Sequence, residues 1–222
     1  MKKMDLTGKK AVFLGDSITE GFCADAPESI YHQVLKRLVG LREAVSYGIG
    51  GTRVARQKMP SSDPKCDNDF NMRADKMDED ADFVFVFGGT NDFGHGDAPL
   101  GILNDDTVWT FYGALNCLFK TLTERYGKEK IIVLTPMHRY NDTSLYGDGN
   151  KETKGHILAD YVDAVRKVSA IYGFKIIDLF SCSELDPNIK AIGENYFADG
   201  LHPNNAGHYK LAEVIAAELK KM

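Results

Sequence analysis

Five short apolar runs recur along the chain, and amphipathic stretches separate them. The runs cover residues 11–14, 44–47, 83–87, 131–134 and 175–179. Several are rich in Val, Ile and Phe and nearly continuous in apolar character, which is typical of strands that are buried on both faces. We therefore predict that these runs are the strands of a buried sheet.

The stretches between the runs carry apolar residues at helical spacing. The predicted helices cover residues 28–39, the segment between a cap at Asp106 and Gly127, residues 156–172, and a last helix from about Asn205. Gly40, Gly127 and Gly173 stand where a glycine commonly ends a helix. Strand and helix thus alternate through the whole chain. This predicts an α/β fold with a parallel sheet and helices on both faces, in one domain of residues 1–222.

Right-handed crossovers place the carboxyl ends of all parallel strands on one edge of the sheet. Ligands of such open sheets bind outside that edge. Two polar stretches, residues 59–71 and 140–155, break the alternation and predict loops. The second stretch follows the fourth predicted strand, so we expect it at the ligand-binding edge.

Composition narrows the class of protein. Of the 222 residues, 43% are apolar and 27% are charged, which is ordinary for a globular protein. The net charge is −5 and the pI is near 5.7. Nucleic acids and anionic membranes attract basic surfaces, so we expect neither nucleic acid nor a stably bound membrane as a partner.

The four cysteines are far apart in the sequence: Cys23, Cys66, Cys117 and Cys182. They form no CxxC pair, so neither a metal site nor a disulfide framework is predicted. Free thiols are typical of the reducing cytoplasm. The basic N-terminus is not followed by the apolar segment of a signal peptide, and residues 11–14 are too few to span a membrane. We therefore expect a cytoplasmic protein.

The first predicted strand runs into Gly15, Asp16 and Ser17. A serine just past the carboxyl end of a strand lies at the ligand-binding edge, where its own N–H can point at a bound anion. Ser17 is therefore a candidate nucleophile. The alternative is that Asp16 and Ser17 only cap the next turn, as these residue types often do.

Glycine-rich segments follow the second and third predicted strands. Residues 48–53 are Gly-Ile-Gly-Gly-Thr-Arg, and residues 88–92 are Gly-Gly-Thr-Asn-Asp. Glycines allow the backbone to approach a ligand closely, and Asn91 can donate its side-chain N–H to an oxyanion. The alternatives are a tight turn and an Asx-turn without a ligand. Neither segment has the pattern of a phosphate-binding loop.

A histidine with an aspartate three residues before it lies near the C-terminus. Histidine is the natural general base at neutral pH, and Asp199 can reach the imidazole of His202 within one turn and fix its tautomer. For each of the other histidines a surface or packing role is the better interpretation: His32, His95, His138, His156 and His208. Among these, His95 and His138 follow the third and fourth strands and can line the pocket.

These segments all fall at predicted loop positions, three of them directly after the first three strands. One sheet edge can therefore gather a nucleophile, a base with its orienting acid, and oxyanion donors. Together these groups are what acyl transfer requires. Four unrelated turns explain the same coincidence less well.

The same segments resemble the sequence blocks of the SGNH hydrolases, the GDSL-like lipase/esterase family. The residues that carry the resemblance span positions 15 to 204 and are Ser17, Gly51, Asn91, Asp199 and His202. The family implies a flavodoxin-like three-layer α/β/α sandwich with a five-stranded parallel sheet. It also implies a serine esterase without a metal or organic cofactor.

The resemblance further implies a role for each residue. Ser17 is the expected nucleophile, His202 the base, and Asp199 the acid that orients it. Ser17, Gly51 and Asn91 are the expected oxyanion donors, with Gly50 as a rival for the place of Gly51. In the second block, Thr52 and Arg53 replace the acidic residue that often follows the glycine, which suggests a different pocket rim.

We expect a small-molecule ester substrate with a short acyl chain, and acetylated carbohydrates are one candidate class. Arg53, Arg139 and the 140–155 loop can offer polar surface to a sugar, while Phe93 and Trp109 are the large apolar side chains expected to border the site. An acyltransferase or thioesterase on the same triad is an alternative. A non-catalytic module that binds a flavin or a carbohydrate is another. The sequence leaves the oligomeric state open.

Overall fold

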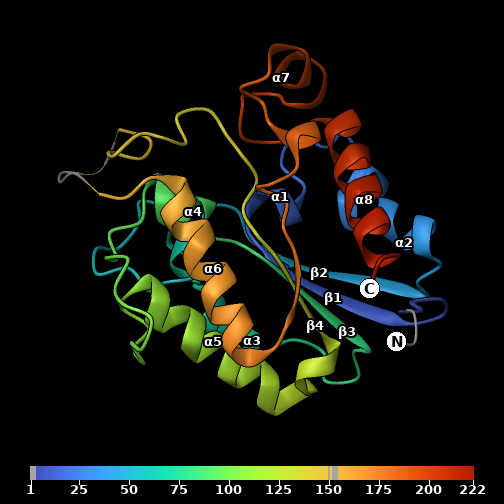
Figure 1. The fold of residues 1–222 in the computed structure, drawn as a ribbon, viewed down its shortest axis with the longest axis horizontal. Helices are drawn as coiled ribbons and strands as arrows, with labels where there is room; N and C mark the ends of the chain where they lie inside the picture. The colour runs from blue at the N-terminus through green and yellow to red at the C-terminus, as the bar shows by residue number, and fades with distance from the viewer. Residues whose placement is uncertain (1–3, 150, 152–154) are drawn as a thin grey trace.

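The computed structural model of the protein describes residues 4–149, 151 and 155–222. Among these residues, five strands form one parallel sheet in the order β2-β1-β3-β4-β5 (Figure 1). The strands are β1 (Lys10–Gly15), β2 (Glu43–Gly48), β3 (Phe83–Phe87), β4 (Ile131–Leu134) and β5 (Lys175–Ile177). This order is that of the flavodoxin-like fold, as expected.

Helices cover both faces of the sheet, so the fold has three layers (Figure 1). One face carries α2 (Tyr31–Val39) and α8 (Asn205–Leu219), which pack against each other. The other face carries α3 (Phe70–Ala74), α5 (Phe111–Tyr126) and α6 (Leu158–Tyr172). The short helices are α1 (Ser17–Glu20), α4 (Thr90–Gly94) and α7 (Lys190–Tyr196), and the 3-10 turns are η1 (Pro27–Ser29), η2 (Pro64–Asp67), η3 (Lys128–Lys130) and η4 (Ser183–Leu185).

The sheet separates two apolar cores, and alternate residues of each central strand belong to different cores. In β1, Val12 and Leu14 pack with α3, α5 and α6, whereas Ala11 and Phe13 pack with α2 and α8. Successive side chains of a strand point to opposite faces, so a strand that is buried on both faces must be apolar at every position. This explains the continuous apolar runs of the sequence.

The predicted helices exist, but three of them begin later than expected, and α6 begins at Leu158 rather than at residue 156. Residues 27–29 form a 3-10 turn and Ile30 is extended, so α2 begins at Tyr31. Helix α5 is capped by Thr110, whose side chain accepts a hydrogen bond from the Gly113 N–H, and Asp106 is not its cap. A loop that Asp105 closes, through its bond with the Thr110 hydroxyl, occupies the residues before Thr110.

The two polar stretches connect elements, as predicted. Residues 59–71 contain η2 and the first turn of α3. Residues 140–155 form turns beyond the carboxyl end of β4; residues 150 and 152–154 of this stretch lie outside the described part of the chain. Within the described residues, no helix combines the length and the apolar character needed to cross a membrane.

The chain crosses from one side of β1 to the other between β2 and β3. Strands β2 and β3 therefore flank β1, and the loops that follow β1 and β3 diverge at the carboxyl edge. Ligands of doubly wound sheets bind in the crevice at such a point. The topology thus places the ends of β1, β2 and β3 around one candidate site.

Two histidines are buried behind α1, within the core that α2 and α8 cover. His32 stacks on Phe13, and the His208 ring lies parallel to that of Tyr31. Burial lowers the pKa of both imidazoles from the usual 6.5 to about 4. The folded protein therefore holds them neutral in a pH range in which the unfolded chain protonates them.

These histidines predict a loss of stability in mild acid. Between pH 6.5 and about 4 the unfolded chain binds protons that the folded chain does not, so the free energy of unfolding falls as pH falls, by up to about 3 kcal/mol for each histidine. Denaturant unfolding from pH 7 to 4 measures this slope, which should be shallower in His32→Gln and in His208→Gln. His156→Gln, at an exposed position, is the control and should keep the wild-type slope.

Asp16 acts in the opposite direction over part of the same range, because burial raises its pKa to about 6. The test is therefore the difference in slope between each variant and the wild type. Parallel curves for the wild type and both buried-histidine variants would show that these imidazoles do not titrate with unfolding.

Candidate active site

Ser17 is the first residue of α1, and one residue, Asp16, separates it from the carboxyl end of β1. The helix is capped by Asp16, whose carboxylate accepts a hydrogen bond from the Ile18 N–H at 3.0 Å. The capping role considered for both residues is thus taken by Asp16, which leaves the Ser17 hydroxyl for another contact. That contact is the His202 Nε2, 2.9 Å from the Ser17 Oγ.

The aspartate three residues before His202 holds the other side of the imidazole. One carboxylate oxygen of Asp199 lies 2.7 Å from the His202 Nδ1, and the other accepts hydrogen bonds from the backbone N–H groups of His202 and Leu201. Burial raises the pKa of Asp199, but these hydrogen bonds outweigh it and hold the pKa below its usual range. The charged carboxylate therefore favours the tautomer with its proton on Nδ1, and Nε2 is left to accept from Ser17.

The glycine-rich segment after β2 lies against Ser17. A Cβ atom added to Gly50 would be 3.6 Å from the Cβ of Ser17. The Gly50 N–H donates to the Glu20 carboxylate at 2.9 Å. Within the described part of the chain, the Gly51 N–H donates to no protein acceptor. Of the two rival glycines, Gly51 is therefore the one whose amide is available to a ligand.

Asn91 faces the same segment from the start of α4. Its side-chain amide donates to the Thr52 carbonyl at 2.9 Å, and the residue is only 4% exposed. The neighbouring Asp92 is also buried, and its carboxylate accepts from the N–H groups of Val54 and Ala55. Burial raises the pKa of Asp92, whereas these two amides lower it. Residues 91 and 92 thus fix the segment that follows Gly51.

A buried arginine joins the ends of β1 and β2 below the site. The Arg73 guanidinium donates to the carbonyl groups of Gly15 and Tyr47 and to the Thr52 hydroxyl. Burial lowers its pKa to about 10, which still leaves it charged at neutral pH. No signal in the sequence distinguished this arginine from others, because its partners are backbone carbonyls of distant segments.

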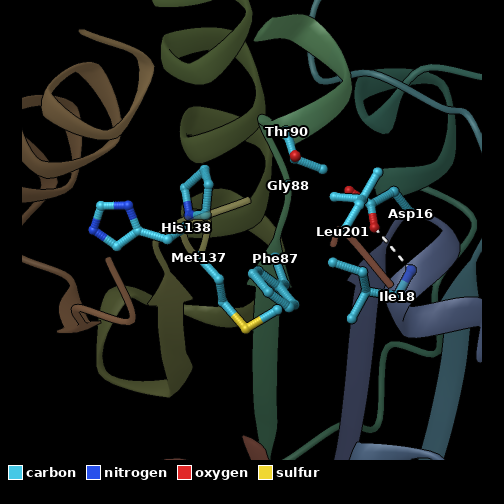
Figure 2. A pocket seen from close by; sticks show the side chains of 9 residues that line it. Asp16, Ile18, Phe87, Gly88, Thr90, Met137, His138 and Leu201 are labelled. Carbon is cyan, nitrogen blue, oxygen red and sulfur yellow. Dashed lines mark hydrogen bonds between the residues drawn. The ribbon is translucent and has the colours of Figure 1, made fainter. Parts of the chain in front are cut away.

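A small hollow lies between the ends of β1, β3 and β4, and it is lined by the two chain neighbours of Ser17 rather than by Ser17 itself (Figure 2). Asp16 and Ile18 line one side and Gly88 and Thr90 another, and Leu201 closes it near His202. Its lining is completed by Phe87, Pro136, Met137 and His138. The space holds about 10 Å³, roughly the room for one water molecule.

Four side chains were expected to border the site, but three of them are buried and the fourth packs in another loop. Arg53 and Arg139 are buried and bonded to Asp67 and Asp148, so the polar rim expected from them is not free to bind a substrate. Phe93 is fully buried and packs on Tyr161 in the core. Trp109 is partly exposed and packs against Arg56, in the loop that precedes α5.

The two histidines considered for the pocket have other partners. His138 lines the hollow, but its ring points away from it (Figure 2), stacks on Phe180 and bonds to Asp142 at 2.6 Å. His95 lies near Asp148, and its Nε2 is 3.5 Å from the Gly51 carbonyl. Other histidines therefore also have an aspartate partner. Among the described histidines, His202 alone contacts a serine hydroxyl.

Phe22 also contacts the site, although no sequence pattern pointed to it. Its ring meets that of His202 edge-on with 4.6 Å between centroids, and the residue is 54% exposed. An aromatic ring this exposed beside a histidine offers an apolar surface to a ligand. Among the described residues, no group of three His, Cys, Asp or Glu side chains is arranged to hold a metal ion.

The family model of the GDSL-like lipases/acylhydrolases matches residues 13–210. The chain therefore belongs to the GDSL-like Lipase/Acylhydrolase family and is a hydrolase of ester bonds. No curated protein matches it.

Solved structures share the fold along nearly the whole chain. A protein from Lactobacillus plantarum is 30% identical, with a TM-score of 0.82 over 97% of this chain and 98% of its own. The lipase/acylhydrolase from Enterococcus faecalis is 23% identical, with a TM-score of 0.66 over 96% of each chain. An acetyl xylan esterase, AlAXEase, is 20% identical, with a TM-score of 0.63 over 94% of this chain and 98% of its own.

The surroundings of Gly51 predict that a side chain there destabilises the protein. Its φ is +73°, and a Cβ atom would lie 2.6 Å from the Cys66 Sγ. Gly8 has the same φ of +73° with no atom within 4 Å of its Cβ position, so Gly8→Ala measures backbone strain alone, about 1–2 kcal/mol. Gly51→Ala should cost more in denaturant unfolding. An equal loss in the two variants would mean that Cys66 moves aside freely.

Proposed function

We propose that this hydrolase is a serine esterase that acts through an acyl-enzyme. The observation that carries the proposal is the chain of contacts from the Ser17 Oγ to the His202 Nε2 at 2.9 Å and from the His202 Nδ1 to Asp199 at 2.7 Å. A serine hydroxyl is a weak nucleophile until an adjacent base accepts its proton. The family membership supports an ester hydrolase, and this geometry supports these three residues as its catalytic set.

In the proposed reaction, the Ser17 oxygen attacks the ester carbonyl as His202 takes the hydroxyl proton. The tetrahedral intermediate then collapses, the bond to the alcohol breaks, and His202 returns the proton to the departing alcohol. Water attacks the acyl-enzyme with His202 again as base, which releases the acid and restores the serine. Asp199 orients the imidazole and stabilises its charged form.

Three donors are proposed for the oxyanion: the N–H groups of Ser17 and Gly51 and the side-chain amide of Asn91. The free Gly51 N–H supports this choice over Gly50, whose N–H is already bonded to Glu20. Asn91 uses one amide hydrogen on the Thr52 carbonyl, and its second hydrogen is the one proposed to reach the oxyanion. Donors held in place before the reaction stabilise the developing charge without reorganisation.

The proposed substrate is an ester with a short acyl group and a ring-shaped alcohol, and acetylated carbohydrates combine the two. Phe93, one of the two large apolar side chains expected to border the site, is fully buried in the core, so it offers no apolar surface to a long alkyl chain. The departing alcohol must lie beside the His202 Nε2 that protonates it, and the exposed Phe22 ring contacts that imidazole. Phe22 thus supports a leaving group with an apolar face.

Ser17→Ala should abolish ester hydrolysis and leave the melting temperature nearly unchanged, because the change removes only one oxygen atom, at the first residue of α1. The measurement is p-nitrophenyl acetate turnover together with labelling by a fluorophosphonate, located by mass spectrometry. The wild type should be labelled on Ser17, and the variant should not be labelled.

His202→Gln should also be inactive, whereas His156→Gln should keep wild-type turnover. His156 is the matched control, because it too contacts an aspartate, Asp160, at 3.3 Å but contacts no serine hydroxyl. Full activity of Ser17→Ala would refute the proposed nucleophile.

Acyl length provides an independent test. Acetyl and butyryl esters of p-nitrophenol should have kcat/KM values at least about tenfold above that of the dodecanoyl ester, because each methylene that finds no room loses binding energy. The long ester is assayed below the concentration at which it forms micelles. Faster turnover of the dodecanoyl ester would identify a lipase and would contradict the short-chain proposal.

A further inference from the structure

Both polar backbone atoms of Gly50 are bound by side chains from other segments. Its N–H donates to the Glu20 carboxylate at 2.9 Å, and its carbonyl accepts from the Cys66 thiol at 3.5 Å. Glu20 is the last residue of α1, and Cys66 lies in the 3-10 turn η2.

These two contacts fix the direction of the next amide. The Gly50 carbonyl and the Gly51 N–H belong to one planar peptide group, and in a trans peptide they point in opposite directions. None of the described peptide bonds is cis. Holding the Gly50 carbonyl toward Cys66 therefore turns the Gly51 N–H away from Cys66. The bond from the Gly50 N–H to Glu20 holds the same turn from its other side.

Glu20 also connects this turn to Ser17. The two residues are three positions apart on α1, and side chains at this spacing lie on the same side of a helix. The Cβ position of Gly50 is 3.6 Å from the Ser17 Cβ and 2.6 Å from the Glu20 carboxylate. One helical turn therefore carries the proposed nucleophile and the group that holds the adjacent loop.

We propose that Glu20 is a positioning residue that, with Cys66, holds the Gly50–Gly51 peptide so that the Gly51 N–H faces the oxyanion formed at Ser17. The inference rests on the proposed function, because it gives Gly51 an oxyanion role. Glu20 touches no reacting atom. Its acceptor oxygen is what matters, since a negative charge close to an oxyanion opposes catalysis.

The experiment compares Glu20→Gln with Glu20→Ala in the full chain. Glutamine keeps an oxygen that can accept from the Gly50 N–H and removes the charge, whereas alanine removes both. Loss of one oxyanion donor lowers kcat about 10²–10³-fold, and a donor that is misdirected rather than removed should lose part of that, about tenfold or more. In Glu20→Ala we expect this fall in kcat with KM within about twofold, because the donor acts in the transition state. Glu20→Gln should restore most of the wild-type kcat.

Asp82→Ala is the matched control. Asp82 also accepts a backbone N–H at 2.9 Å, from Lys10 at the amino end of β1, which is the opposite end of the sheet from the site. This variant should keep the wild-type kcat even if its melting temperature falls. A fall in kcat that merely follows stability would appear in Asp82→Ala as well.

The outcomes separate this inference from the proposed function. Activity that survives Ser17→Ala would refute the proposed function whatever Glu20 does. If Ser17 is required but Glu20→Ala keeps its kcat within twofold, only the positioning role fails. It also fails if Glu20→Gln is as slow as Glu20→Ala, since the charge would then matter, or if KM rises as much as kcat falls.

Discussion

The buried Arg73 is the interaction on which the carboxyl edge of the sheet depends. Parallel strands end in carbonyl groups that point outward, and such groups are costly to bury unless donors reach them. Arg73 donates to the Gly15 carbonyl of β1, the Tyr47 carbonyl of β2 and the Thr52 hydroxyl beyond Gly51. A single guanidinium thereby fixes the distance between the strand that leads to Ser17 and the loop that lies over it.

Side chains next to the proposed catalytic residues hold the remaining loops. Asp16 caps α1 beside Ser17, and Asp92 binds two amides of the segment that Asn91 contacts. Both carboxyl groups are buried, and burial raises the pKa of each. Fully formed networks of this kind are rigid, because any displacement leaves a buried polar group without a partner. The site thus gains the fixed donors that its chemistry requires at some cost in stability.

The sequence predicted much of this arrangement, and the reasons differ between fold and site. Buried strands are apolar at every position, so the strand segments stood out, and their alternation with helices predicted the parallel sheet. Helix starts were less predictable, because Asp106 and Thr110 are both of a residue type that often caps a helix. Thr110 is the cap, since the residues before it form a loop that Asp105 closes. At the site, the segments of Ser17, Gly51, Asn91 and His202 were selected because each follows a strand or resembles a family block.

By itself the sequence determined the layered fold and the segments that meet at its carboxyl edge, because hydrophobic periodicity and the alternation of strand and helix are visible in local stretches of the chain. Only the tertiary structure decided which groups are free. Among the described histidines, His95, His138 and His156 also contact an aspartate. The contact with the Ser17 hydroxyl is what distinguishes His202 from them. Burial of Arg53 and Arg139 removes them from the rim. Hydrogen bonds between residues distant in sequence depend on packing, which no local pattern encodes.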